Sequence, residues 1–130
     1  MSNAAPPSLR LLFVLCAALG QGACNTKSAG PPISAEARAE ATELFSSRCS
    51  VCHGPGGAGD GPASAGLVPK PRNFGDRAWQ ASVTDEHIEK IIQYGGAAVN
   101  KSAAMPSNPD LVAKPATVTA LRAHVRQLAR

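Results

Sequence analysis

Apolar residues recur at helical spacing in the segment that begins near residue 34. Their positions are i, i+4, i+7 and i+8, which place them on one face of a helix. Ser34 is a favoured N-cap residue, and Glu36 in the following turn suits a helix N-terminus. The pattern predicts a helix that begins near Ser34 and runs into Cys49. The apolar face comprises Ala37, Ala41, Leu44 and Phe45.

Two later segments show the same periodicity. The first has Thr84 as N-cap, a hydrophobic staple between Val83 and Ile88, and Gly95 at the C-cap. The second begins at about Thr117. No segment alternates with the period of two that a half-buried strand requires, so the expected fold class is all-α with long loops. The inward positions are Ile88, Ile91 and Ile92 in the first segment and Val118, Leu121, Val125 and Leu128 in the second, with the basic residues Arg122, Arg126 and Arg130 towards its end.

Residues 54–75 cannot form a regular element. They contain seven Gly and four Pro, and these residues interrupt helices and strands alike. A loop of this length inside a small domain usually has a functional reason. We expect it to wrap around a bound group.

Composition limits the kind of protein. Of the 130 residues, 44% are hydrophobic and only 4% are aromatic. That is enough for one small domain but not two, and such a thin core needs a cofactor, a metal or disulfides to complete it. The net charge of +4 comes from 13 basic and 9 acidic residues that are scattered along the chain. Because no basic run is interleaved with aromatics, nucleic-acid binding is excluded.

The N-terminal region has the features of an export signal. Arg10 precedes the apolar residues 11–19, a run too short to span a bilayer but typical of a secretory signal. Small residues then lead to Cys24, which resembles the lipidated cysteine of bacterial lipoproteins. Gln21 replaces the usual Leu of that motif, so ordinary signal cleavage nearby is the alternative. The protein is therefore expected in the periplasm, or anchored through Cys24 to a membrane that faces it. The expected organisation is a signal peptide at 1–23, a flexible linker at 24–33 and a folded domain at 34–130.

The chemistry lies in a C-x-x-C-H segment, with thiols at Cys49 and Cys52 and an imidazole at His53. This is the attachment signature of a c-type haem, in which the two thiols bond to the porphyrin and the adjacent histidine binds the iron. A redox-active dithiol would need a βαβ context that the chain lacks, and a plain disulfide would leave His53 unexplained. A zinc site would need two histidines three to five residues apart, and the chain has no such pair.

A haem iron bound by one histidine needs a sixth ligand. Met105, followed by Pro106, is the one methionine that remains after removal of a signal, and it lies 52 residues beyond His53 in the loop-like run NKSAAMPSNPD. Its thioether is the preferred candidate. The competing ligands are His87, in the first turn of an expected helix, and His124, within the terminal helix, and neither has the freedom of a loop.

Together these residues resemble a class I cytochrome c. From about Ala41 to Leu128 the chain is similar to small bacterial monohaem proteins that carry CxxCHG…GDGP…PKPRNF…GG…MP. The resemblance implies a few helices around one covalently bound haem c, close crossing of the first and last helices, His53 and Met105 as axial ligands, and electron transfer. Two departures, Ala41 in place of a glycine and His124 in place of an aromatic residue, predict a looser or more polar crossing.

The resemblance also implies further cofactor-binding residues. In this family a proline carbonyl in the loop after the motif accepts the free N–H of the proximal histidine, which by spacing indicates Pro62, with Pro69 as the alternative. Tyr94 is another candidate for the cofactor site. The candidates to hold the haem propionates are Arg72, Arg77 and Trp79, for which a solvated arginine and a core tryptophan are equally good interpretations.

The expected function is single-electron transfer between redox protein partners by a monomer that is not an enzyme. No nucleophile and base pair is visible, and a mildly basic surface would steer an acidic partner. One alternative is a haem-c sensor or ligand-binding module with an open or displaceable sixth position. Another is an accessory haem subunit of a larger oxidoreductase. The candidates for steering are Lys70, Lys90, Lys101 and Lys114.

Overall fold

The computed structural model describes residues 32–129 together with Met1. The expected signal peptide, Cys24, most of the expected linker and Arg130 lie outside the described residues. The described residues form helices and turns without a strand, which confirms the all-α fold class. None of their helices has the length and apolar character needed to cross a membrane. The elements are α1 (Ala35–Leu44), the π-helical turn η1 (Phe45–Cys49), α2 (Ser50–His53), the 3₁₀ turn η2 (Pro62–Ser64), α3 (Arg77–Ser82), α4 (Asp85–Tyr94), the 3₁₀ turns η3 (Ala97–Val99) and η4 (Pro109–Leu111), and α5 (Pro115–Gln127).

The first helix begins where the sequence predicts. The Ser34 hydroxyl accepts a hydrogen bond from the Ala37 N–H at 3.2 Å, and Ala37, Ala41 and Phe45 are buried while Leu44 is half-buried. η1 and α2 follow α1 without a break. The C-x-x-C-H segment therefore lies at the end of a helical run that starts in the core.

The π-helical turn η1 was not predicted from the sequence. It closes with the Ser50 N–H bonded to the Phe45 carbonyl. Serine hydroxyls donate to backbone carbonyls throughout this turn: those of Ser46 and Ser47 bond to the Glu43 carbonyl, and that of Ser50 bonds to the Ser46 carbonyl. Such bonds compete with the regular helical ladder and loosen it locally. Turns of this kind are frequent at functional sites, and this one ends at the first cysteine of the C-x-x-C-H segment.

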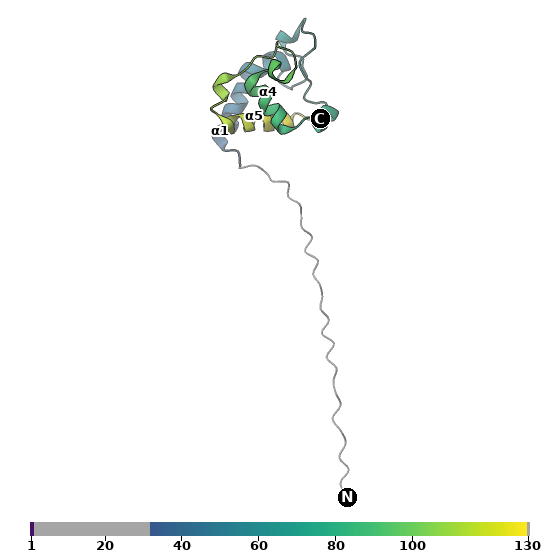
Figure 1. Cartoon of the computed structure of the whole chain (residues 1–130), viewed down its shortest axis with the longest axis vertical. Coiled ribbons are helices and arrows are strands. Elements are labelled where there is room, and N and C mark those ends of the chain that lie inside the picture. Colours follow the sequence, from purple (N-terminus) through teal and green to yellow (C-terminus); the bar gives the residue numbers. More distant parts are fainter. Residues whose placement is uncertain (2–31, 130) are drawn as a thin grey trace. The chain divides into compact units, whose positions relative to one another are not determined.

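The core forms where α1, α4 and α5 meet. α1 and α5 lie side by side, and α4 packs against α5 (Figure 1). Ala41 is only 1% exposed at the α1–α5 contact, and the Phe45 and His124 ring centroids are 4.3 Å apart. His124 thus packs as an aromatic residue would, but a cavity of about 200 Å³ remains beside it. The cavity is lined by Arg38, Ala41, Thr42, Ala120, Ala123, His124 and Gln127.

Helix α4 also begins and ends as predicted. The Thr84 hydroxyl accepts a hydrogen bond from the backbone N–H three residues later at 3.2 Å, and Gly95 ends the helix with a φ of 78°. Ile88 and Ile92 are buried, whereas Ile91, which was expected to point inward, is half-buried. The apolar stripe is therefore narrower than the sequence indicated.

The short helix α3 was not predicted. None of its six residues is buried, so no apolar stripe marks it in the sequence. The Asp76 carboxylate caps it by accepting from the Trp79 N–H at 3.1 Å, and the Gln80 amide joins it to α5 by donating to the Val125 carbonyl at 2.9 Å. A helix this short depends on tertiary contacts for its stability.

Helix α5 begins at Pro115, two residues before the predicted start, because proline suits the first turn of a helix. Its basic side chains are not simply solvated. Arg122 forms ion pairs with Asp85 and Glu89, and Arg126 forms one with Asp85. These pairs join α5 to the first half of α4. The residues of α5 that are buried are Thr117, Val118, Ala120, Leu121 and Val125.

Candidate functional site

The two cysteines of the C-x-x-C-H segment lie about one helical turn apart. Cys49 is the last residue of η1, Cys52 lies in α2, and both thiols are free and half-buried. Burial raises the pKa of the Cys49 thiol to about 11, so it is protonated and neutral near pH 7. Between residues 32 and 129 no three His, Cys, Asp or Glu side chains gather as metal ligands. The two free thiols are therefore spaced for attachment to one and the same group.

The imidazole of His53 is held in one tautomer. His53 ends α2 and is 9% exposed, and Gly54 stops the helix with a φ of 76°. The His53 Nδ1 lies 3.1 Å from the Arg72 carbonyl oxygen, and because a carbonyl can only accept, Nδ1 is the donor. Burial lowers the pKa of the imidazole, which favours its neutral form. Nε2 therefore keeps a lone pair for an iron atom.

The carbonyl that accepts this bond differs from the predicted one. Pro62 begins η2 and is exposed, and neither its carbonyl nor that of the alternative proline receives the His53 N–H. The loop instead folds back so that Arg72 reaches the ring. The Gly59 N–H donates to the His53 carbonyl at 2.8 Å, and a Cβ on Gly59 would overlap the Pro71 carbonyl oxygen. Residue spacing does not predict this close approach of two backbone segments, because the approach requires a residue without a side chain at position 59.

Phe74 is a site residue that sequence reasoning did not assign. Its ring is stacked on that of His53, with centroids 4.4 Å apart and an interplanar angle of 16°. It also contacts the rings of Phe45 and Trp79, at centroid distances of 6.5 Å and 5.6 Å. The PKPRNF run could have indicated this residue, because it places an aromatic side chain two positions after Arg72.

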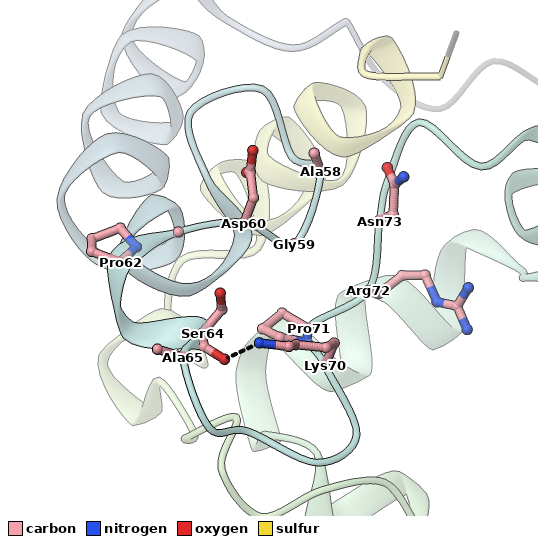
Figure 2. A pocket seen from close by; sticks show the side chains of 11 residues that line it. Ala58, Gly59, Asp60, Pro62, Ser64, Ala65, Lys70, Pro71, Arg72 and Asn73 are labelled. Atoms are coloured by element: carbon pink, nitrogen blue, oxygen red, sulfur yellow. Dashed lines mark hydrogen bonds between the residues drawn. The ribbon is translucent and has the colours of Figure 1, made fainter.

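A cavity of about 760 Å³ opens beside the loop that follows the C-x-x-C-H segment (Figure 2). Its walls come from residues 58–62, 64–65 and 70–73, and the cysteines, His53 and Met105 do not line it. Lys70 reaches across to donate a hydrogen bond to the Ser64 carbonyl at 2.9 Å (Figure 2). The cavity thus belongs to the wrapping loop and not to the cysteine and histidine ligands.

The residues considered for the haem propionates have other contacts. The Arg72 guanidinium lies 5.7 Å from the centroid of the Trp79 ring and pairs with Asp76 at 3.3 Å. Trp79 is half-buried against the core, and Arg77 is exposed at the start of α3. Tyr94, the last residue of α4, is 48% exposed. A role in haem binding stays a prediction for these residues.

Met105 lies in a segment that is fixed to the C-terminal end of α4. Its carbonyl accepts from the Gly96 N–H at 3.0 Å, and its side chain is half-buried. Further along, the Asn108 amide donates to the Ile92 carbonyl at 2.7 Å. The Asp110 carboxylate then pairs with Arg48, the residue before the first cysteine, at 2.9 Å. The segment therefore runs from α4 to the start of the C-x-x-C-H segment, although no described contact joins Met105 to His53.

The competing histidines have other surroundings. His87 is half-buried in the first turn of α4, where its backbone N–H bonds to the Thr84 hydroxyl. His124 packs on Phe45 at the α1–α5 contact, and its Nε2 is buried without a hydrogen-bond partner among the described residues. Burial lowers the pKa of His124. A place between α1 and α5 suits packing better than ligation.

The residues present fit a covalently attached haem. Two free thiols at helical spacing precede a neutral imidazole whose Nδ1 is engaged and whose Nε2 is available. The glycine-rich loop also approaches closely, since a Cβ on Gly61 would overlap the Ser50 and Val51 carbonyl oxygens. This donor set is that of a c-type haem.

Comparison with known proteins agrees with this chemistry. The family model described as Cytochrome c matches residues 39–129. A solved structure of the KustC0563 c-type cytochrome is 27% identical, with a TM-score of 0.52, and the similarity covers 69% of this chain and 98% of that chain. No curated protein matches. The chain belongs to the cytochrome c family. It is a haem c-binding electron-transfer protein with a single haem c attached covalently through its C-x-x-C-H motif, which comprises Cys49, Cys52 and His53.

Proposed function

We propose that this protein is a periplasmic carrier of single electrons, not an enzyme, in which His53 and Met105 bind the haem iron from opposite sides. The observation that carries the proposal is the arrangement around His53. Its Nδ1–H is bonded to the Arg72 carbonyl, so its Nε2 is the ligand atom. With His53 and Met105 as its ligands, a bound haem would supply one-electron chemistry without a bound substrate.

Two cysteines would attach the haem, and a backbone carbonyl would orient its histidine ligand. When bound, the haem supplies an iron atom that gains or loses one electron. The thiols of Cys49 and Cys52 form the covalent attachment, and the Arg72 carbonyl increases the basicity of the His53 imidazole through the hydrogen bond. A Met105 thioether on the other side would raise the reduction potential relative to a second histidine.

The position of the Met105 segment supports its proposed role. Backbone and side-chain bonds hold it at the end of α4, and the Arg48–Asp110 ion pair brings its far end to the residue before Cys49. A sensor or ligand-binding module would need Met105 to be absent from the iron or easily displaced. Nothing in the anchoring of this segment favours displacement over ligation.

Electron exchange would take place with redox protein partners that dock on a monomer. Of the four lysines considered for steering, Lys114 pairs with Glu40 at 2.7 Å and Lys70 bonds to the Ser64 carbonyl. Lys90 and Lys101 are exposed, and no ion pair is found for either within residues 32–129. We infer that steering by a basic surface is weak and rests mainly on Lys90, Lys101 and Lys70, since a hydrogen bond to a neutral carbonyl leaves the charge of Lys70 in place.

Export is supported by the apolar run at 11–19 and by the covalent attachment chemistry of the family. A lipid on Cys24 would keep the carrier at a membrane surface facing the periplasm. Without it, cleavage would release a freely diffusing carrier. The proposed electron transfer is the same in both cases.

Replacing Met105 by alanine tests the proposed function. The wild-type ferric protein should show the weak long-wavelength charge-transfer band of iron bound to a thioether, and Met105→Ala should abolish it and lower the reduction potential. The ferrous variant should also bind carbon monoxide readily, whereas the wild type should resist it. Absorption spectra of the purified holoprotein report the band and the carbon monoxide binding, and a redox titration followed by absorbance reports the potential.

His87→Ala and His124→Ala are the controls for this test, because they remove the competing ligands. Both variants should keep the band. If the wild type lacks the band, or if a histidine variant changes the spectrum while Met105→Ala does not, the proposed ligation is wrong. Ready carbon monoxide binding by the wild type would favour the ligand-binding module.

A further inference from the structure

We propose that Phe74 is the positioning residue that fixes the plane of the His53 imidazole. The inference rests on the proposed function, since it takes His53 to be an axial ligand of the iron. It adds an orienting residue that acts through the ligand and does not touch the metal.

The stacked ring supplies a restraint that the hydrogen bond lacks. The Nδ1–H bond to Arg72 holds one atom of the imidazole, and a ring held at one atom can still tilt. Phe74 covers the imidazole face at a centroid distance of 4.4 Å with only 16° between the planes. Both rings are almost completely buried, at 9% exposure for His53 and 8% for Phe74. A tilt of the imidazole would therefore push against a closely packed neighbour.

Phe74 is itself held on several sides. Its N–H donates to the Gly57 carbonyl at 2.7 Å, and its carbonyl accepts from the Gln80 amide at 2.8 Å. A Cβ on Gly57 would crowd the Phe74 ring, so the glycine allows the close approach. Phe45 and Trp79 contact the ring as well. These contacts come from protein groups alone and do not require the iron.

The anchoring continues to the terminal helix. Gln80 is bonded to α5 through the Val125 carbonyl at 2.9 Å, and its side-chain oxygen accepts from Arg126 at 2.9 Å. Arg126 in turn pairs with Asp85. The orientation of His53 is thus connected to the tertiary packing of α3, α4 and α5, while its chain position is set by α2.

Imidazole orientation can be measured directly in the ferric holoprotein. The direction of the axial imidazole plane controls how unpaired spin is distributed over the porphyrin, and the proton NMR shifts of the haem methyl groups report this distribution. The order and spread of these signals follow ligand orientation. General loss of stability does not by itself change their order.

The test compares Phe74→Leu with Phe45→Leu in the ferric holoprotein. Both substitutions remove a buried aromatic ring from the same cluster, but the only ring contact with His53 that the structure describes is that of Phe74. Phe74→Leu should change the order and spread of the haem methyl shifts and make them more temperature-dependent. Phe45→Leu should lower the melting temperature while leaving the order of the shifts unchanged, because the bonds to Gly57 and Gln80 still hold Phe74.

Phe74→Met provides a second variant that keeps most of the buried volume without a flat ring, in case the leucine variant fails to fold. It should show the same change in shift order. Unchanged shifts in the folded Phe74 variants, or equal changes in Phe45→Leu, would overturn the inference. The wild-type spectrum separates this outcome from failure of the proposed function, because signals of a coordinated methionine and histidine would still be present there.

Discussion

The His53 side and the Met105 side of the site are held in different ways. His53 has a backbone carbonyl from Arg72 on one ring atom and the Phe74 ring against its face, and Phe74 is itself part of the core. Met105 is held through the backbone of its own segment, and Asn108 provides the nearby side-chain bond to α4. One side is thus held by tertiary packing, and the other mainly by the end of α4, with the Arg48–Asp110 ion pair at the far end of its segment.

This difference indicates how each side responds to change. A substitution in the core or in the glycine-rich loop should change the orientation of the His53 imidazole, because the restraints on this ring come from residues 59–74 and from α3 and α5. Disturbance of the Met105 segment should open the sixth position while the rest of the domain stays folded. The following substitutions test that distinction.

The largest effect is expected from Gly59→Ala on the His53 side. Gly59 has a φ of +81°, and its new Cβ would overlap the Pro71 carbonyl oxygen, so the backbone that carries the Arg72 acceptor must move. We expect a loss of about 3 kcal/mol in the free energy of unfolding, combining left-handed strain and overpacking. Denaturant unfolding of the ferric holoprotein measures it.

Gly66→Ala is the matched control for this substitution. Gly66 has a similar φ of +76°, but nothing lies within 4 Å of the added Cβ. Gly66→Ala should lower the free energy of unfolding only by the backbone strain, about 1 kcal/mol. Equal losses for the two variants would mean that the close approach at Gly59 does not hold the His53 side together.

A smaller effect is expected from Asn108→Ala on the Met105 side. The substitution removes the bond from the Asn108 amide to the Ile92 carbonyl, at a cost of about 1 kcal/mol. If the substitution destabilises only the state in which Met105 binds the iron, added imidazole should displace Met105 about fivefold more readily, because about 1 kcal/mol corresponds to that factor. Titration of the ferric protein with imidazole, followed by absorbance, measures the change.

Asn73→Ala is the corresponding control on the His53 side. It removes a bond in which the Asn73 side-chain oxygen accepts from the Gly75 N–H at 2.8 Å. It should lower stability without changing imidazole affinity. A comparable gain in affinity for both variants would remove the distinction between the two sides.

The smallest effect is expected from acidification at His124. Burial lowers its pKa below the ordinary value of 6.5, so below that pH the unfolded chain binds more protons than the folded one. Stability should therefore fall as pH drops from about 6.5 through the folded pKa, and it should level off below. No carboxylate lines the adjacent cavity to offset the charge, and Arg38 there has the same sign.

Replacing His124 by phenylalanine checks this linkage. His124→Phe keeps a ring against Phe45 and should reduce the slope of unfolding free energy against pH in the range just below 6.5. His87→Gln, a histidine removed from a different helix, controls for general effects of the substitution. An unchanged slope in His124→Phe would show that the buried ring at the α1–α5 contact does not titrate with folding.

Local signals in the sequence predicted more of the helices than of the site. Ser34, Thr84 and Gly95 each act where they were expected, because a cap depends on its own residue and the neighbouring turn. The C-x-x-C-H segment is equally local, and the family match confirms its covalent haem. The helix α3 was missed because it has no apolar stripe of its own. The π-helical turn was missed because it depends on serine hydroxyls that compete with backbone N–H groups for the helix carbonyls.

The sequence by itself determined the features that depend on residues close together in the chain. These are the haem-attachment segment, the capped helices and a long loop that cannot form a regular element. Only the tertiary structure decided which backbone carbonyl meets His53 and which ring covers it. Arg72 and Phe74 lie 19 and 21 positions beyond the histidine, and they reach it because glycines allow two stretches of backbone to approach closely. Such an approach depends on where the loop closes, and spacing along the chain does not specify it.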